Sequence, residues 1–252
     1  MIKQRILLLD TNVIDIATAV DQTLLLVSEK KGAYVCASNV HMCMEVYDTP
    51  EFEQIVNGAN MVLPDGRPLL WAQKLLGHHG ATQVRGQDIM TELCAISRKK
   101  GLRMGLYGGQ SESVLTAVQA KLRQDYSSIK LFYQFSPPFR PLTPAEDAEV
   151  VAQINSAGVD ILFVGIGCPK QERWMAEHKD KLSCVMLGVG AAFDFMAGQK
   201  KHAPRWMQRI GLEWFFRLCS EPKRLWKRYL LHNPRFIFYF GVQLLKSKST
   251  RS

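Results

Sequence analysis

Six short apolar segments in the first 190 residues constrain the fold of this chain more than any other feature. They are rich in β-branched and aromatic residues and occupy positions 33–37, 61–63, 102–107, 129–134, 161–164 and 184–187. Stretches with helical patterning lie between them, at roughly 42–57, 68–76, 86–99, 111–124, 144–157 and 170–178. Strands that alternate with helices indicate βαβ units. We therefore predict an α/β fold with a Rossmann-like, mostly parallel sheet and flanking helices.

Local signals support several of these helix boundaries. Thr143 can cap a helix, Pro144 suits the first helical position, and Glu146 completes a capping box. Gly101 and Gly158 each follow a helical stretch and precede an apolar segment. We expect both glycines to adopt the left-handed conformation that commonly ends a helix.

Basic residues are concentrated at the C-terminal end of the chain. Residues 199–252 contain 13 lysines and arginines against Glu213 and Glu221, a net charge of +11, whereas the first 198 residues have 19 basic and 21 acidic residues, a net charge of −2. The last 54 residues also hold ten of the 24 aromatic side chains. Within them, 206–219 and 222–231 have the pattern of amphipathic basic helices. We expect an α/β domain at 1–198 and a basic helical appendage at 199–252, suited to a polyanion or an anionic membrane surface.

The cysteines and the apolar runs bear on the compartment. The six cysteines form no CxxC pair, which argues against a zinc site or a disulfide scaffold and is typical of a reducing cytosol. The first apolar run ends at Asp10, too early for a signal peptide. No run reaches the roughly 18–20 apolar residues of a membrane span, and the longest in the tail contains Gln243. We expect a cytoplasmic protein, free or attached peripherally to the membrane.

Polar residues that directly follow the predicted strands are the first candidates for a ligand site, because open parallel sheets bind ligands at the carboxyl ends of their strands. Asp65 lies in a Pro-Asp-Gly sequence after the second segment. This sequence fits a simple turn, and it also fits a carboxylate placed as a general base. Arg67 and Arg85 could bind an anionic substrate, although single arginines are more often surface residues.

Two glycine-containing junctions are the next candidates. Gly108 and Gly109 join a predicted strand to a helix, as in a tight turn or in a loop whose backbone N–H groups approach a phosphate. Residues 165–172 are less generic, with Gly167 before a proline and with Lys170 and Gln171 in the first helical turn. Gln171 could hydrogen-bond sugar hydroxyls. The same pattern also fits a well-formed helix start.

Several motifs are missing, and their absence narrows the function. GxGxxG and GxxxxGK[ST] do not occur, which disfavours an oxidoreductase that uses a nucleotide cofactor. There is no GxSxG, so a serine hydrolase is unsupported. HExxH, a Cys/His cluster and the Asp-x-Asp pair of one class of sugar-nucleotide enzymes are also missing. We therefore expect no required metal and no cofactor.

Eight ordered pieces of sequence carry a family pattern, at 37–39, 63–66, 84–88, 106–109, 165–172, 188–195, 203–206 and 211–218. With these pieces the chain resembles the WecG/TagA/CpsF glycosyltransferases (glycosyltransferase family 26) from about residue 33 to residue 240. The resemblance implies an inverting, metal-independent transferase. It would move a hexose (N-acetylmannosamine, its uronic acid or glucose) from a UDP-sugar to an undecaprenyl-diphosphate-linked sugar in bacterial surface polysaccharide synthesis.

The resemblance also implies residue roles. Asp65 matches the proposed general base for the acceptor hydroxyl, and Asn39, Arg85 and Gln171 match substrate-site positions. Ala37 stands where many members have threonine. One base is enough for inversion, because the acceptor hydroxyl attacks C1 opposite the departing UDP and no covalent nucleophile is needed.

The appendage has a counterpart in the family, where it binds the membrane and supplies cations to the site. Arg217 and Arg224 match such cations, and Lys227 and Arg228 match less closely. The implied partners are a UDP-sugar, a lipid-linked acceptor and the anionic inner face of the cell membrane, and a homo-oligomer is allowed. On this basis, deleting the residues after about 199 should abolish membrane binding and activity and spare the fold of the domain. The alternative from composition alone is a nucleic-acid-binding α/β protein with a basic aromatic tail.

Overall fold

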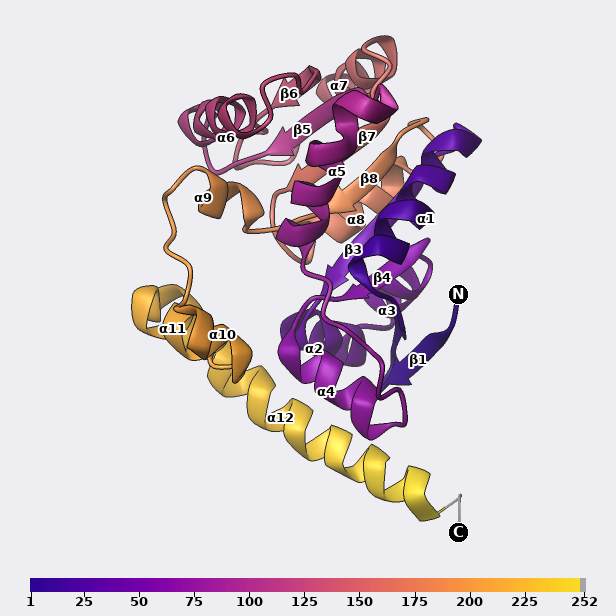
Figure 1. The fold of residues 1–252 in the computed structure, drawn as a ribbon, viewed down its shortest axis with the longest axis vertical. Helices are drawn as coiled ribbons and strands as arrows, with labels where there is room; N and C mark the ends of the chain where they lie inside the picture. Colours follow the sequence, from indigo (N-terminus) through magenta and orange to yellow (C-terminus); the bar gives the residue numbers. More distant parts are fainter. Residues whose placement is uncertain (250–252) are drawn as a thin grey trace.

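A computed structural model describes residues 1–249 and contains the predicted sheet (Figure 1). Its six strands are β3 (Ala33–Ser38), β4 (Met61–Pro64), β5 (Met104–Gly108), β6 (Leu131–Phe135), β7 (Ile161–Gly165) and β8 (Val185–Gly188). The strand order is β4-β3-β8-β7-β5-β6, and every neighbouring pair is parallel. All six carboxyl ends therefore lie at one edge of the sheet. The predicted strands and the α/β class are confirmed.

Helices cover both faces of this sheet. One face carries α1 (Ile16–Glu29), α5 (Gly86–Lys100), α6 (Glu112–Asp125) and the short α9 (Ala192–Met196), and the other carries α2 (Val40–Asp48), α3 (Pro50–Asn57), α4 (Arg67–Leu75), α7 (Pro144–Ser156) and α8 (Lys170–His178). Two buried clusters result because alternate strand residues face opposite sides. On β3, for example, Val35 packs into one cluster and Cys36 into the other.

The predicted boundary signals are present. The Thr143 hydroxyl accepts from the Glu146 N–H, and the Glu146 carboxylate accepts from the Thr143 N–H. Gly101 and Gly158 have φ angles of +66° and +59°. The single helix expected at 42–57 was wrong. Two helices meet there instead, because Pro50 has no N–H with which to continue α2 and starts α3 in its place.

An antiparallel hairpin that the sequence patterns did not predict precedes the sheet. It consists of β1 (Lys3–Ile6) and β2 (Leu9–Asn12) and packs beside β4. The Asn12 Oδ1 atom accepts from the Val62 N–H at 2.7 Å. The buried Gln73 amide of α4 donates to the Thr11 hydroxyl at 2.9 Å and to the Asn12 carbonyl at 3.0 Å. These contacts hold α4 and the hairpin together at the β4 side of the sheet.

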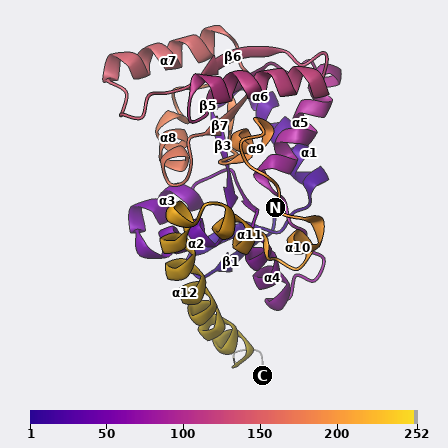
Figure 2. The ribbon, with the colours of Figure 1, turned by 90° about the vertical axis from the view of Figure 1, so that its left-hand side faces the viewer.

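The C-terminal segment packs on the domain as α10 (Arg205–Arg209), α11 (Glu213–Ser220) and α12 (Pro222–Ser249). Figure 2 shows α12 crossing α2 and continuing toward the far end of the molecule. The single helix expected at 206–219 was wrong, because the chain turns at Gly211 with φ +76°. The helix expected at 222–231 is longer and continues past Pro234. Among residues 1–249, no helix combines the length and apolar character that a bilayer span requires.

Candidate functional site

A cavity of about 910 Å³ opens at the carboxyl edge of the sheet. Its floor comes from the residues that follow the strands, and the appendage supplies part of the wall. Nine of the predicted site residues line it: Asn39, Asp65, Arg85, Gly109, Gly167, Lys170, Gln171, Arg217 and Arg224. Gly108 ends β5 directly before Gly109 and is not part of the lining, and neither is Arg67.

Asp65 lies at the end of β4, half-buried beside the appendage. Its N–H donates to the Ser38 carbonyl at 2.8 Å, which fixes the position of the residue between β3 and β4. The pKa of the Asp65 carboxyl is raised to about 7, mainly by burial and next by the negative charge of Glu213, while Arg85 and Arg217 act in the opposite direction. A carboxyl group with a pKa near 7 can take up a proton at neutral pH.

Asn39 connects the domain to the appendage. It caps α2, because its Oδ1 atom accepts from the Met42 N–H at 3.3 Å. The same oxygen accepts from Arg228 Nη2 of α12 at 3.4 Å. Arg228 itself lines the cavity, and burial lowers the pKa of its guanidinium. Arg228 therefore lines the cavity together with Arg217 and Arg224, the two appendage arginines among the predicted site residues.

Arg85 is held by partners on both sides. Its Nε and Nη2 atoms donate to the two carboxylate oxygens of Asp88 at 2.7 and 2.9 Å. Its Nη1 atom donates to Gln208 Oε1 of α10 at 2.8 Å. The guanidinium is thus fixed between α5 and the appendage, with one face on the cavity.

Gln171 is buried at the start of α8. Its Oε1 atom accepts from the Gly167 N–H at 3.2 Å, and its Nε2 atom donates to Glu172 Oε1 at 2.7 Å. The side chain rests on Gly188, where an added Cβ would lie 2.9 Å from Gln171 Nε2. Glu172 is fully buried, and burial raises its pKa to about 7. The amide keeps one free donor and one free acceptor position for a ligand.

The glycines at the strand ends have mainly structural partners. Gly108 has φ +137°, and an added Cβ would lie 2.5 Å from the Gly165 carbonyl oxygen, so no side chain fits. The Gly109 N–H donates to that same carbonyl at 3.2 Å. The Gly167 N–H is bonded as well, to Gln171. The amides of Gly109 and Gly167 are therefore not directed at the cavity, although the sequence allowed the Gly108–Gly109 loop to approach a phosphate.

The charge around the cavity is mainly positive. Arg85, Lys170, Arg217, Arg224 and Arg228 line it, whereas two of the lining carboxylates have cationic partners within the protein. Asp194 is paired with Lys200, and Asp147 is paired with Lys181. Behind the wall, Asp88 is paired with Arg85. Arg217 lies 5.7 Å over the Phe195 ring, and its Nε atom has no hydrogen-bond partner within residues 1–249. This arrangement suits an anionic ligand.

Sequence patterns missed several lining residues. Tyr107 and Trp174 stack at 4.2 Å in the wall, and Trp174 stacks in turn on His178. Glu213 carried no signal either, because its effect on Asp65 depends on how the appendage folds back. In the described part of the chain, the one group of side chains arranged like metal ligands lies outside the cavity lining.

Comparisons with known proteins agree with this geometry. Residues 4–250 match the model of the family described as "Glycosyl transferase WecG/TagA/CpsF family". A Bacillus subtilis (strain 168) protein is 31% identical over 206 residues, which cover 81% of this chain and 77% of the relative. A Bacillus spizizenii protein is 27% identical over 210 residues, 83% of this chain and 79% of the relative. Both relatives are named N-acetylglucosaminyldiphosphoundecaprenol N-acetyl-beta-D-mannosaminyltransferase.

Proposed function

The chain belongs to the WecG/TagA/CpsF family of glycosyltransferases, and we propose that it moves a hexose from a UDP-sugar to an undecaprenyl-diphosphate-linked sugar. The names of the two relatives favour N-acetylmannosamine as the hexose, ahead of its uronic acid or glucose, and an N-acetylglucosamine-bearing acceptor. One observation carries the proposal. A carboxyl group with a pKa near 7 faces a cavity that is lined by basic side chains, among them Lys170, Arg217 and Arg228.

Asp65 is the general base of the proposed reaction. The acceptor hydroxyl gives its proton to the Asp65 carboxylate, and its oxygen forms a bond to C1 of the donor sugar. The C1–O bond on the opposite face breaks, and its electron pair leaves with UDP, so the configuration at C1 inverts. Asn39, Arg85 and Gln171 line the same cavity as Asp65 and supply the polar contacts that would orient the two sugars.

The departing diphosphate gains negative charge, and we assign its stabilisation to basic side chains with no metal ion. Lys170 at the first turn of α8 and Arg217, Arg224 and Arg228 of the appendage lie around one cavity. Preorganised cations are most effective where charge develops in the transition state. Adding Mg²⁺ to chelator-treated enzyme should therefore not raise turnover, and a strict requirement for Mg²⁺ would contradict this assignment.

Residues 199–252 serve in this proposal as the membrane-associating appendage at the inner face of the cell membrane. The outer surface of α10, α11 and α12 exposes large apolar side chains, among them Trp206, Phe215, Trp226, Ile237 and Phe238. An amphipathic basic surface of this kind lies in the interface of an anionic bilayer. Docking by this surface would bring a lipid-linked diphosphate to the arginines of the cavity wall.

A donor panel tests the proposed reaction. The full-length protein is incubated with UDP-N-acetylmannosamine, its uronic acid form, UDP-glucose or UDP-N-acetylglucosamine, together with a short-chain lipid-diphosphate N-acetylglucosamine acceptor. Mass spectrometry should show one hexose added from UDP-N-acetylmannosamine, and NMR should show inverted anomeric configuration. Transfer from none of these donors, or a product with retained configuration, would overturn the proposal.

Membrane binding is tested separately, against the alternative of nucleic-acid binding. Anionic liposomes and single-stranded DNA are offered to the protein at the same salt concentration. We expect co-sedimentation with the liposomes and much weaker binding to DNA, because three appendage arginines face the cavity. Tight DNA binding without liposome binding would favour the alternative.

A further inference from the structure

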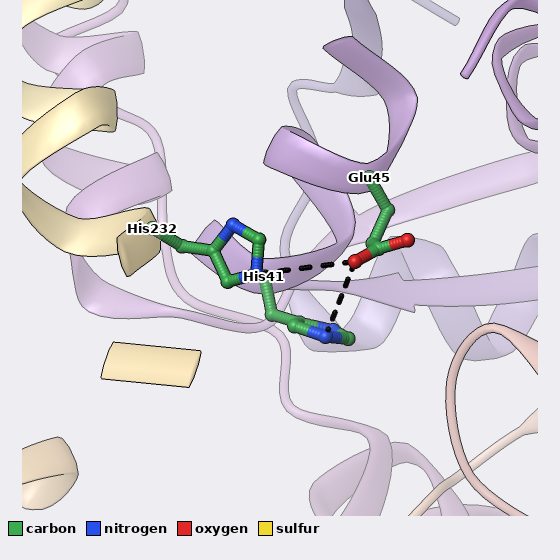
Figure 3. Close-up of side chains that lie close together, drawn as sticks. All are labelled: His41, Glu45 and His232. Carbon is green, nitrogen blue, oxygen red and sulfur yellow. Dashed lines mark ion pairs between the residues drawn. The ribbon is translucent and has the colours of Figure 1, made fainter. Parts of the chain in front are cut away.

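Three side chains meet where α12 crosses α2, at a place that the proposed reaction does not use. His41 and Glu45 lie four residues apart on α2 and therefore share a face, and His232 approaches them from α12 (Figure 3). Glu45 Oε1 lies 3.6 Å from His41 Nε2 and 3.9 Å from His232 Nε2. One potential ligand atom from each residue lies within 4.8 Å of the other two.

These side chains do not satisfy one another as hydrogen-bond partners. Both distances from the carboxylate to the imidazoles exceed hydrogen-bond length. The Nδ1 atoms of His41 and His232 are buried and have no hydrogen-bond partner within residues 1–249. Since these Nδ1 atoms have no hydrogen bond to lose, each ring can turn either of its nitrogens toward a metal ion.

Burial disfavours the charged form of both imidazole rings. Burial lowers the pKa of His41 to about 3, with smaller contributions in the same direction from Arg228 and His232. Burial also lowers the pKa of His232, which is faced by Glu45, Arg235, Asp48 and Arg228. Arg235 is neutralised by Asp48, whose two oxygens accept from it at 2.5 and 2.8 Å. Imidazole nitrogens and carboxylate oxygens are both common ligands of transition-metal ions.

The donor set is the one that zinc prefers. Two imidazoles and one carboxylate, with solvent in a fourth position, form a common tetrahedral zinc site. Ligand atoms at zinc–ligand distances of about 2.0–2.2 Å lie roughly 3.3–3.5 Å apart in a tetrahedron. The two measured separations of 3.6 and 3.9 Å are close to this value, so small side-chain rotations would complete the geometry.

We propose that His41, Glu45 and His232 bind a divalent transition-metal ion of the zinc class, which fastens α12 to α2. His232 lies one helical turn beyond Arg228, and His41 lies two residues beyond Asn39. An ion at this place therefore holds the contact between Arg228 and Asn39 at the cavity wall. Its role is structural, since none of its three ligands lines the cavity.

Calorimetry on untagged, chelator-treated full-length protein tests the site with Zn²⁺ alone. We expect one ion per chain. Removing a residue that hydrogen-bonds to a metal ligand typically weakens metal binding about 10–100-fold. Removing a ligand itself, in His41→Gln, Glu45→Gln or His232→Gln, should therefore weaken Zn²⁺ binding by at least about that factor. His79→Gln, a change at an exposed histidine on the surface, is the matched control and should bind as the wild type does.

Two further measurements do not depend on activity. Co²⁺ bound in place of Zn²⁺ should give the intense visible absorption of tetrahedral coordination in the wild type and not in His232→Gln. Zn²⁺ should also slow limited proteolysis of α12 in the wild type and in His79→Gln, and leave the rate unchanged in His232→Gln. The absence of one-to-one binding to the wild type, or equal affinity in wild type and His232→Gln, would overturn the proposal. Stoichiometric binding without protection of α12 would overturn the fastening role.

Discussion

At the scale of single residues, Asp65 shows how two distant parts of the chain set the property of one side chain. The strand end and its burial come from the domain. The carboxylate of Glu213 and the guanidinium of Arg217 come from the appendage and act on the Asp65 pKa in opposite directions. The protonation of the proposed base thus depends on whether the appendage is docked.

Replacing Asp65 with Asn should remove the proton acceptor and retain the shape of the side chain. General-base help is typically worth roughly 10²–10⁴-fold in rate, and we expect kcat to fall by about that factor. Steady-state kinetics with the donor and acceptor identified by the panel measures the effect. Asp125→Asn, at a residue that pairs with Lys121 on α6 away from the cavity, is the control. Full turnover in a folded Asp65→Asn protein would remove Asp65 from the mechanism.

The stability of the same variant has a defined pH dependence. Folding raises the pKa of Asp65 from about 4 in an unfolded chain to about 7. The stabilisation that this proton brings is complete below pH ~4 and is lost as the pH rises through 7. Asp65→Asn has no such titration, so its thermal midpoint should improve relative to the wild type between pH 4 and pH 8. This comparison also shows whether the variant is folded.

The pH profile of activity should respond to Glu213. Because the base form of Asp65 is required, kcat/KM should rise with pH and level off above about 7. Glu213→Gln removes the negative charge that raises this pKa, so the midpoint of the profile should move to lower pH. Glu112→Gln, on α6 outside the cavity lining, should leave the midpoint unchanged. An unchanged midpoint in Glu213→Gln would mean that the two carboxylates do not interact in solution.

At the scale of elements, the sequence predicted best where a pattern is local. Strands such as β3 and β7 are buried on both faces, and their continuous apolar runs made them recognisable. Each strand of the hairpin β1–β2 has four residues and only one apolar side chain, Ile6 or Leu9, so neither strand shows a periodicity that predicts it. The helix breaks at Pro50 and Gly211 lie inside amphipathic stretches. Periodicity alone therefore predicted one continuous helix at each place, where the structure has two.

In the candidate site, too, the sequence predicted the residues whose position depends on a local pattern and missed those that depend on distant packing. Asn39, Asp65 and Gln171 could be placed at one edge from the sequence, because each follows a strand of a parallel sheet. The role of Glu213 could not, because it lies about 150 residues beyond Asp65 in the sequence and reaches the cavity only through the packing of α11. Arg228 was indicated only by the family resemblance, in which it matches less closely than Arg217 and Arg224.

The packing of α12 on α2 can be tested with two neighbouring phenylalanines. Phe236 is 5% exposed and packs in the core with α2, whereas Phe238 is 67% exposed. Truncating a buried phenylalanine typically costs about 3–5 kcal/mol, so Phe236→Ala should lower the free energy of unfolding by about that amount. Phe238→Ala should change it by less than about 0.5 kcal/mol. Equal effects in chemical denaturation would show that α12 is not docked in this way.

At the scale of the whole molecule, the appendage and the domain share one core. Phe236 and Phe240 of α12 are buried with residues of α2 and α3, and Gln243 accepts from the Leu7 N–H at 2.8 Å. Deleting residues after about 199 would therefore uncover apolar surface of the domain. The expectation that such a deletion spares the fold needs revision, and point changes on the outer surface are the better test of membrane binding.

Charged substitutions on that outer surface should weaken membrane attachment and keep the fold. Phe238→Glu removes about 2 kcal/mol of apolar burial in the bilayer interface, which corresponds to a roughly 30-fold weaker partition onto anionic liposomes. Sedimentation with vesicles of matched charge measures this. Leu25→Glu, at a 55% exposed position on α1, is the control and should partition as the wild type does. Unchanged sedimentation of Phe238→Glu would place the membrane-binding surface elsewhere.

The cavity wall supplied by α11 and α12 also has a consequence for the timing of synthesis. The ribosome makes the strand ends and Asp65 before the arginines at 217, 224 and 228. N-terminal parts of a chain generally begin to fold while the rest is still being translated. A nascent or prematurely terminated chain thus has Asp65 before the cationic wall of the cavity exists. Donor sugars would then be held only by finished molecules, and truncated products would not compete for them.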